Sequence, residues 1–285
     1  MRAGFIGLGN IGKPLAMHLA PAGFETTVFD LDEAPVRELV AGGAVAARSA
    51  REVAERADVI GICVPEDRHV RAVMNGPDGV LVGAKPGTVV LIHSTILPVT
   101  AIELDHEASP RGVRVLDACV TGGEHLAREA ACTYMVGGDA ALLEQARPFL
   151  EKSSKKIIHA GALGNGAKLK LCLNVMTYLQ WAAAFEPFKL AQAIGLPTDV
   201  LEEAGRANGQ LTDMMSRFLG GVKLPEEARR SDAYQKFVRG HLHTAEKDLA
   251  WALALAREAG VSLPAAALAS QSMARIYGVE DPKRR

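Results

Sequence analysis

The strongest constraint on the fold is an alternation of short strand-like runs and helical stretches over roughly the first 160 residues. An apolar run at the N-terminus ends in a glycine-rich turn, and a helix is expected over 13–20. Strands that alternate with helices favour a parallel, doubly wound sheet with right-handed crossovers. The chain is therefore expected to begin with an α/β domain. The further predicted strands are 26–30, 58–65, 87–93, 113–120, 133–138 and 155–161.

The character of the chain changes after residue 161. Segment 166–193 consists of helix-forming residues and is apolar almost all round. Such a helix is buried on most faces, as an interdomain helix would be. The remainder, up to residue 285, is typical of further helices. We therefore predict two domains, 1–161 and 162–285, the second all-α and connected to the first by this long helix.

Composition excludes several classes of protein. Hydrophobic residues make up 48%, charged residues 23%, and the net charge is −1, which gives no bias toward nucleic acid or anionic membranes. No uninterrupted apolar run reaches the ~18 residues that a membrane span needs. The four cysteines show no metal-ligand spacing, and His241 and His243 have no third ligand at suitable spacing. We expect a cytoplasmic protein without a metal site.

The glycine-rich turn fits the pattern G-x-G-x-x-G, directly after a strand and at the start of a helix. In this context the pattern predicts a dinucleotide-binding Rossmann domain, because the glycines permit a tight turn, the approach of pyrophosphate and close helix–strand packing. Backbone N–H groups at the helix start then bind the phosphates. A glycine-rich turn without a ligand is the alternative. The predicted cofactor-binding residues of this turn are Gly7, Leu8, Gly9, Asn10, Ile11 and Gly12.

Asp30 ends the second predicted strand. A carboxylate at this position can accept hydrogen bonds from the adenosine ribose of NAD. It would repel the 2′-phosphate of NADP by roughly 4 kcal/mol for unit charges about 4 Å apart at an effective dielectric constant of about 20. We therefore expect NAD as the cofactor, with NADP disfavoured unless an arginine near the site accepts it. Asp32 is expected to cap the following helix.

Lys170 and Asn174 are four residues apart on the long helix and therefore share one face. A buried, unpaired ammonium is costly, so Lys170 should border a wet cleft or meet a charged ligand. Desolvation and a nearby cationic nicotinamide would both favour its neutral form, which suits a general base. The alternative is a lysine that reaches solvent from a packed helix.

Two further segments carry chemistry. Thr121, Gly122 and Gly123 close a predicted strand with a hydroxyl and two glycines. Such a turn can hold a substrate carboxylate with backbone amides, although a plain loop is equally compatible with these residues. Lys247 and Asp248 lie late in the helical region, where the sequence alone favours an exposed ion pair.

Four segments of the chain resemble sequence motifs of the β-hydroxyacid dehydrogenase family, and they occur in the same order as in that family. Segment 4–23 resembles its cofactor motif, and DACVTGG is similar to its DAPVSGG. GALGNGAKLKLCLN resembles GxxGxGxxxKxxNN, and EKDLAWAL resembles KDLxLAL. The resemblance implies that Lys170 is the catalytic lysine and Asn174 the second asparagine, with Thr121 at the serine position. It also implies that the residues bordering the cofactor include Val64, Pro65, Thr95 next to Ser94, and Lys247.

The resemblance implies an NAD-dependent oxidoreductase that transfers a hydride between a small β-hydroxy acid, or the corresponding semialdehyde, and the nicotinamide. Lys170 would be the general acid/base, and Thr121, Gly122 and Gly123 would hold the substrate carboxylate. The substrate would lie between the domains. The helical domain would form a homodimer or homotetramer.

Departures from the family pattern leave the substrate open. Leu173 replaces the first asparagine, and Cys119 replaces the proline of the substrate motif. Segment 124–131, which we expect to be a loop, lacks both family glycines. Leu126 in place of the first glycine should narrow the entrance to the carboxylate site or change the backbone near it.

Three other functions remain open. The lysine is usually replaced in the related imine reductases, so its presence favours alcohol chemistry. Phosphogluconate-type enzymes have Lys-x-x-His-Asn, which Leu173 contradicts. A sensor that binds NAD without turnover is the third.

Overall fold

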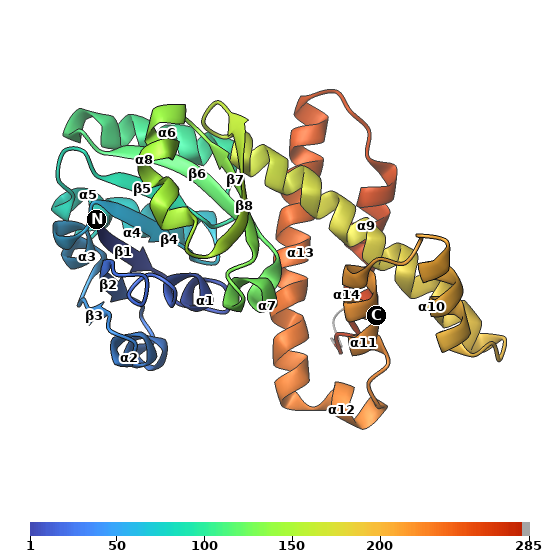
Figure 1. Ribbon diagram of the computed structural model, residues 1–285. Coiled ribbons are helices and arrows are strands. Elements are labelled where there is room, and N and C mark those ends of the chain that lie inside the picture. Colours follow the sequence, from blue (N-terminus) through green and yellow to red (C-terminus); the bar gives the residue numbers. More distant parts are fainter. Residues whose placement is uncertain (281–285) are drawn as a thin grey trace. The chain divides into compact units, whose positions relative to one another are not determined.

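The computed structural model describes residues 1–280 (Figure 1). The chain divides into two compact units, residues 1–170 and the helical part from Leu171 onward. This division falls nine residues beyond the predicted domain boundary at 161/162, inside a helix that had been assigned to the second domain. The predicted domain limits stay a prediction, and residues 281–285 of the second lie outside the described part of the chain.

The first unit is built on an eight-stranded sheet in the order β3-β2-β1-β4-β5-β6-β7-β8. Neighbouring strands are parallel except β6 and β7, which are antiparallel. The α/β doubly wound fold is confirmed, but the sheet is mixed rather than wholly parallel. The strands are β1 (Arg2–Ile6), β2 (Glu25–Phe29), β3 (Val45–Ala46), β4 (Val59–Ile62), β5 (Val89–Ile92), β6 (Arg114–Thr121), β7 (Cys132–Gly137) and β8 (Ser154–Gly161).

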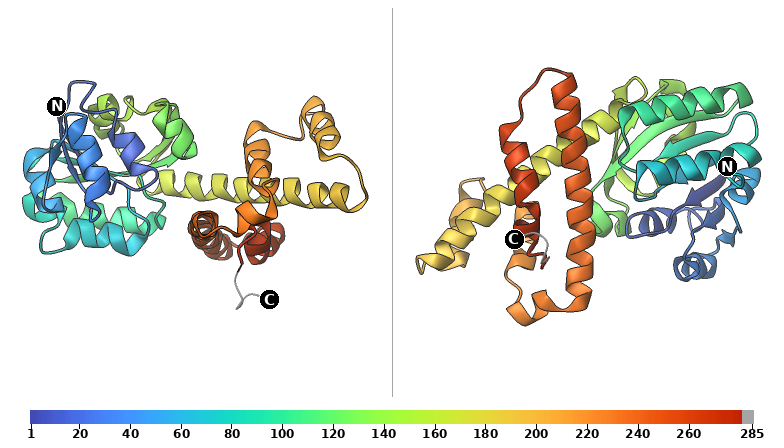
Figure 2. Two further views of the ribbon diagram at one scale, coloured as in Figure 1. Left: turned by 90° about the horizontal axis from the view of Figure 1, so that it is seen from below. Right: turned by 180° about the vertical axis from the view of Figure 1, so that it is seen from behind.

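Helices cover both faces of this sheet (Figures 1 and 2). Side chains of α1, α2, α7 and α8 share one core with the sheet, and those of α3, α4, α5 and α6 share the other. Because successive side chains of a strand point to opposite faces, Phe5 lies in the first core and Ile6 in the second. The helices are α1 (Gly12–Ala16), α2 (Glu33–Ala41), α3 (Ala50–Arg56), α4 (Asp67–Asn75), α5 (Val80–Gly83), α6 (Pro98–Ala108), the 3₁₀ turn η1 (Ser109–Arg111), α7 (Gly123–Arg128) and α8 (Ala140–Leu150).

The first helix is shorter than the predicted 13–20. After Ala16 the backbone forms hydrogen bonds between residues three apart, as in a 3₁₀ turn; for example, the N–H of Leu19 donates to the carbonyl of Ala16. Pro21 follows, and the residue before a proline is biased away from the helical conformation. The α-helix thus ends at Ala16, where these shorter-range bonds begin, and Pro21 disfavours its continuation past Ala20.

The second unit is helical, as predicted. The long helix α9 (Asn165–Ala193) starts in the first unit and continues into the second. In the second unit, α13 and α14 lie side by side (Figure 2), and their core contains Tyr178 of α9, Leu249 of α13 and Met273 of α14. The other helices are α10 (Thr198–Ala207), α11 (Asp213–Val222), α12 (Glu226–Arg230), α13 (Asp232–Glu258) and α14 (Pro264–Tyr277).

Two sequence expectations concern what the chain lacks. Within residues 1–280, no helix has both the length and the apolar character that a membrane crossing needs. Over the same residues, no group of three or more His, Cys, Asp or Glu side chains is arranged to hold a metal ion.

Candidate active site

The glycine-rich turn between β1 and α1 is shaped by close packing. Gly7 has a φ of +89°, and a Cβ there would collide with the carbonyl oxygen of Cys63. A Cβ on Gly12 would collide with the carbonyl oxygen of Gly7. A Cβ on Gly9, in contrast, would meet no atom within 4 Å. The first and third glycines are thus required by the fold, and the second leaves the outside of the turn open, as a bound pyrophosphate requires.

Asp30 follows β2 and lies beside this turn. One carboxylate oxygen accepts a hydrogen bond from the backbone N–H of Leu8, and the other accepts one from the N–H of Asp32 at 2.8 Å. Asp32 in turn caps α2 by accepting from the N–H of Ala34 at 2.9 Å, as predicted. Each carboxylate oxygen has two lone pairs, so Asp30 keeps acceptor capacity for a ribose hydroxyl.

Val64 and Pro65 follow β4, and Thr95 follows β5, at the same edge of the sheet. The order of the strands reverses between β1 and β4, and open α/β sheets bind their ligands outside the carboxyl ends of the strands at such a point. The hydroxyl of Ser94 accepts a hydrogen bond from the N–H of Val64 at 2.8 Å, which joins the two strand ends. The open turn, the carboxylate after β2 and these strand ends fit a nicotinamide dinucleotide.

The predicted substrate turn ends β6 at the same edge. Thr121 is the last residue of the strand, and Gly122 and Gly123 have φ angles of +129° and +69°. Both glycines thus adopt conformations that other residues rarely reach. A Cβ on Gly122 would come within 3.0 Å of the Cβ of Leu126, so Leu126 lies directly against the turn.

The altered segment after this turn is a helix, α7, rather than the expected loop. The ring nitrogen Nε2 of His18 lies 2.8 Å from the carbonyl oxygen of Ala127 and ties α7 to the segment after α1. Ala130 closes the helix with a φ of +53°. The N–H of Ala131 donates to the carbonyl of Leu126 at 2.8 Å, which is the bond of a Schellman helix end, where glycine is the usual residue at the position of Ala130.

The beginning of α9 is held by a buried carboxylate on β6. Asp117 accepts hydrogen bonds from the backbone N–H of Gly164, at 2.8 Å, and of Ala167, at 2.7 Å. Burial raises the pKa of Asp117, and these backbone donors oppose the rise. Sequence reasoning missed this residue, although DACVTGG contains it.

Lys170 lies one turn further along α9 and is half-buried. Burial raises the pKa of the Cys132 thiol to about 11, and the positive charge of Lys170 opposes this rise. The ammonium is therefore within electrostatic reach of Cys132 at the start of β7. The Sγ of Cys132 would lie 3.4 Å from a Cβ on Gly122. Lys170 and the predicted substrate turn thus lie in the same unit, and Cys132, which feels the charge of Lys170, packs against Gly122 of that turn.

In the second unit, Asn174 is buried and donates a hydrogen bond to a carboxylate oxygen of Asp248 at 2.6 Å. The hydroxyl of Tyr178 donates to the same oxygen at 3.3 Å. The other oxygen of Asp248 lies 3.0 Å from the ammonium of Lys247, which also lies over the ring of Trp251 at 4.2 Å.

Lys247 and Asp248 form the expected ion pair, but the expectation that the pair is exposed is wrong. Their side chains are 11% and 0% exposed. Sequence analysis could have found the burial of Asp248, because on α13 it lies on the same helix face as the small or apolar residues Ala245, Leu249 and Ala252.

Comparison with known proteins identifies the family. Residues 2–161 match the family model for the NAD-binding domain of 6-phosphogluconate dehydrogenase, more than half of the chain. Residues 164–282 match the model described as NAD-binding of NADP-dependent 3-hydroxyisobutyrate dehydrogenase. The chain belongs to the β-hydroxyacid dehydrogenase family. The resemblance predicted from the four motifs is thereby confirmed.

Several relatives within this family are known enzymes. The NAD-dependent L-serine dehydrogenase of Pseudomonas aeruginosa is 43% identical over 202 residues, which cover 71% of this chain and 68% of the relative. The 3-hydroxyisobutyrate dehydrogenase of the same organism is 34% identical over 265 residues, 93% of this chain and 88% of the relative. A solved structure of the Mycobacterium tuberculosis 3-hydroxyisobutyrate dehydrogenase with L-serine has a TM-score of 0.80 and 31% identity, and covers 98% of this chain and 94% of that one.

These findings confirm the predicted enzyme class of this β-hydroxyacid dehydrogenase. The relatives are dehydrogenases that act on CH–OH groups, and both family models describe nicotinamide dinucleotide-binding domains. The chain is accordingly an NAD(P)-dependent oxidoreductase of that class.

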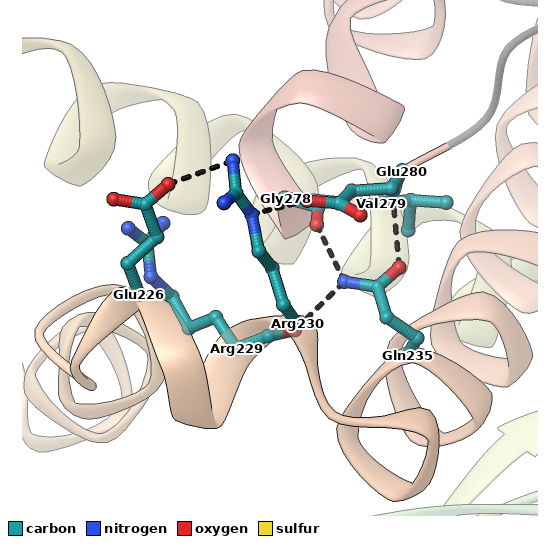
Figure 3. A pocket seen from close by; sticks show the side chains of 7 residues that line it. All are labelled: Glu226, Arg229, Arg230, Gln235, Gly278, Val279 and Glu280. Atoms are coloured by element: carbon teal, nitrogen blue, oxygen red, sulfur yellow. Dashed lines mark hydrogen bonds and ion pairs between the residues drawn. The ribbon is translucent and has the colours of Figure 1, made fainter.

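A pocket in the second unit contains none of the predicted site residues (Figure 3). Its polar groups bind one another. The side-chain amide of Gln235 donates to the carbonyls of Arg229, at 2.9 Å, and Gly278, at 3.1 Å. Arg230 forms ion pairs with Glu226, at 2.7 Å, and Glu280, at 3.0 Å. These contacts join α12, α13 and the end of α14, which is a structural role.

Proposed function

We propose that this enzyme is an NAD-dependent dehydrogenase that oxidises a small β-hydroxy acid, with Lys170 as the general acid/base. The observation that carries the proposal is the position of Lys170 in the first unit. Its ammonium is in electrostatic reach of Cys132, whose sulfur lies next to Gly122 of the substrate turn. L-serine and 3-hydroxyisobutyrate, after which the relatives are named, both carry a hydroxyl on the carbon β to the carboxylate.

The cofactor would be held by the turn Gly7–Gly12, by Asp30 and by the strand ends at Val64, Pro65 and Thr95. On the family motif alone we also propose a cofactor role for Lys247. The chemistry that the dinucleotide supplies when bound is hydride transfer. The carboxylate of Asp30 favours NAD, because a 2′-phosphate beside it would be repelled.

The residues of this chain supply orientation and the proton. Backbone N–H groups at Gly122 and Gly123, with the hydroxyl of Thr121, would hold the substrate carboxylate. Lys170 accepts the proton of the substrate hydroxyl during oxidation and returns it during reduction. Asn174 would orient that hydroxyl. Such proton transfer contributes about 10²–10⁴-fold to the rate.

The assembly and the location are proposed from the family resemblance only. A homodimer or homotetramer is expected, and light scattering on the purified enzyme would measure its mass. The cytoplasmic location stays a prediction.

The test is NADH formation at alkaline pH with a panel of β-hydroxy acids that includes L-serine and 3-hydroxyisobutyrate. Lys170→Ala should lower kcat by about 10²–10⁴-fold while NADH still binds. Lys168→Ala is the matched control, because Lys168 is exposed, lies on the same turn, and its ammonium donates a hydrogen bond to Oδ1 of Asn165 at 3.3 Å. Near-normal turnover in Lys170→Ala would contradict the assignment.

The same assay, extended to cyclic imines with NADH, separates the alternatives. NADH binding without turnover on any substrate would favour a sensor. Activity on cyclic imines but not on hydroxy acids would favour an imine reductase, and release of CO₂ would favour a decarboxylating dehydrogenase.

A further inference from the structure

Asp117 is a buried carboxylate to which the catalytic proposal assigns no task. It lies on β6, four residues before Thr121, and is 0% exposed. Its Oδ1 accepts from the N–H of Gly164 and its Oδ2 from the N–H of Ala167. The first N–H groups of a helix have no partners within the helix. Asp117 therefore caps α9 from a strand 47 and 50 residues away in the sequence.

The surroundings of Asp117 are built closely around its carboxylate. A Cβ on Gly137 of β7 would collide with Oδ1. A Cβ on Gly166 of α9 would lie 2.9 Å from Oδ2 and 2.5 Å from the backbone oxygen of Asp117. Two glycines, one from each neighbouring element, thus leave the room that this side chain occupies.

Capping a helix with a buried carboxylate costs more free energy than capping it with a local side chain. A serine, threonine or aspartate at the N-cap position, Gly164, would satisfy the N–H of Ala167 locally. Burying a carboxylate instead costs free energy, because desolvation disfavours its charged form. What the buried carboxylate adds is a fixed connection between α9 and β6, which no local cap would supply.

One proposed site residue lies on each of the two elements that this connection joins. Lys170 lies three residues after Ala167, on the next turn of α9, and Thr121 lies four residues after Asp117 on β6. We propose that Asp117 is a positioning residue that holds the turn carrying Lys170 in register with the substrate-binding end of β6. It acts through the backbone of α9 and does not touch the reacting atoms. This inference rests on the proposed function of Lys170.

The proposal predicts a selective loss of turnover. A displacement of about 1 Å in a catalytic group costs on the order of 10²-fold in rate. Asp117→Asn replaces one acceptor oxygen by an NH₂ group that faces a backbone N–H, so the first turn of α9 must shift. We expect kcat to fall about 10–100-fold, whereas the KM for NAD and the affinity for NADH should stay within about twofold.

Asp105→Asn is the matched control. Asp105 of α6 also holds β6, because its Oδ1 accepts from the N–H of Val115 at 2.8 Å and lies 3.0 Å from Nε of Arg114. It has no hydrogen bond to α9 among the residues described. We expect Asp105→Asn to lower the melting temperature and to leave kcat unchanged below it. An equal fall of kcat in both variants would assign the effect to stability and overturn the proposal.

A double variant distinguishes positioning from general damage. In Lys170→Ala the turn has no proton-transfer group to position, so adding Asp117→Asn should leave the residual rate unchanged. A further 10–100-fold loss would overturn the proposal, as would a normal kcat in Asp117→Asn alone. If Lys170→Ala itself has normal turnover, the proposed function fails rather than the positioning argument.

Folding of the variant is checked by NADH binding. Should Asp117→Asn bind no NADH, Asp117→Ser takes its place, because a hydroxyl still accepts one amide bond and occupies less space. Loss of NADH binding in both variants would assign Asp117 to folding and overturn the proposal.

Discussion

The carboxylate of Asp30 accepts a hydrogen bond from the backbone N–H of Leu8, inside the glycine-rich turn. The residue that is proposed to select the cofactor therefore also fixes the backbone that would bind its phosphates. A substitution of Asp30 therefore affects both the choice of cofactor and the conformation of the glycine-rich turn. Any variant meant to alter cofactor choice must keep an acceptor at this position.

Asp30→Asn combined with Leu31→Arg should shift the preference toward NADP. Asparagine keeps one acceptor oxygen for the turn and removes the negative charge. Leu31 is 94% exposed, so an arginine side chain at this position would not collide with neighbouring side chains. A repulsion of roughly 4 kcal/mol corresponds to about 10³-fold, at 1.4 kcal/mol for each factor of ten. We expect the ratio of kcat/KM for NADP to that for NAD to rise by at least about 10²-fold.

The control for this experiment is Asp32→Asn. Asparagine caps a helix about as well as aspartate, so α2 should remain intact and the preference should change little. If the double variant leaves the NADP-to-NAD ratio as it was, Asp30 is not the selecting residue.

Asn174→Ala should destabilise the second unit by about 1–3 kcal/mol, because a buried carboxylate loses a hydrogen-bond donor. The partner is Asp248, which would retain the hydroxyl of Tyr178 and the nearby Lys247. Both tryptophans of the chain, Trp181 and Trp251, belong to this unit. Tryptophan fluorescence during urea unfolding therefore follows this unit by itself.

Thr177→Ala is the comparison for that measurement. Its hydroxyl donates a hydrogen bond to the carbonyl of Leu173 in the same helix, at 3.1 Å, so its removal should cost less than about 1 kcal/mol. In Asp248→Ala, the effect of Asn174→Ala should shrink by about 0.5–3 kcal/mol. Independent, additive effects would show that the two side chains do not interact.

Ala130→Gly should stabilise the first unit. A non-glycine residue in the left-handed conformation costs about 1–2 kcal/mol, and the greater freedom of glycine in the unfolded chain offsets about 0.4–1 kcal/mol of the gain. We expect a net gain of about 0.5–1 kcal/mol, measured as a higher melting temperature. Ala131→Gly, next to it but without a positive φ, should lower the melting temperature. Equal shifts in both would contradict the argument.

Much of the fold followed from local patterns. Strands buried on both faces, such as Val59–Ile62 and Val89–Ile92, appear in the sequence as short continuous apolar runs. The two-residue strand β3 is too short to produce a pattern. The antiparallel pairing of β6 and β7 depends on the short connection through α7, because only parallel strands need a long crossover. Segment 124–131 was interpreted as a loop, so that connection was not recognised.

The candidate site likewise contains residues that a local pattern indicates and residues that depend on long-range contacts. The glycine turn, Asp30 and Lys170 carry local signals in spacing and context. The hydrogen bonds of Asp117 to α9 and of Asn174 to Asp248 join residues 47 to 74 positions apart. No local pattern specifies such a contact, since it depends on how whole elements pack.

Acidification should destabilise the first unit through His93. The ring is 2% exposed, and burial lowers its pKa from 6.5 to about 4, although the bond of Nδ1 to the carbonyl of Ala118 opposes this. The rings of Phe5, Tyr134 and Phe149 surround it and supply no charge to pair with an imidazolium. The folded protein therefore keeps His93 neutral at a pH at which the unfolded chain protonates it.

The direction in which stability changes with pH follows from the number of protons that the folded and unfolded states bind. Above pH 6.5 neither state protonates this histidine, so its contribution to stability is complete. Between pH 6.5 and about 4 only the unfolded state binds the proton, and stability falls as the pH falls. A shift from 6.5 to about 4 corresponds to a loss of about 3 kcal/mol, at 1.36 kcal/mol for each pKa unit.

Calorimetric unfolding of wild type and His93→Phe across this range isolates the effect, because the other titrating groups are common to both. The stability difference between wild type and variant should shrink or reverse by about 3 kcal/mol toward pH 4, and a difference that stays constant with pH would show that His93 does not titrate as its burial requires.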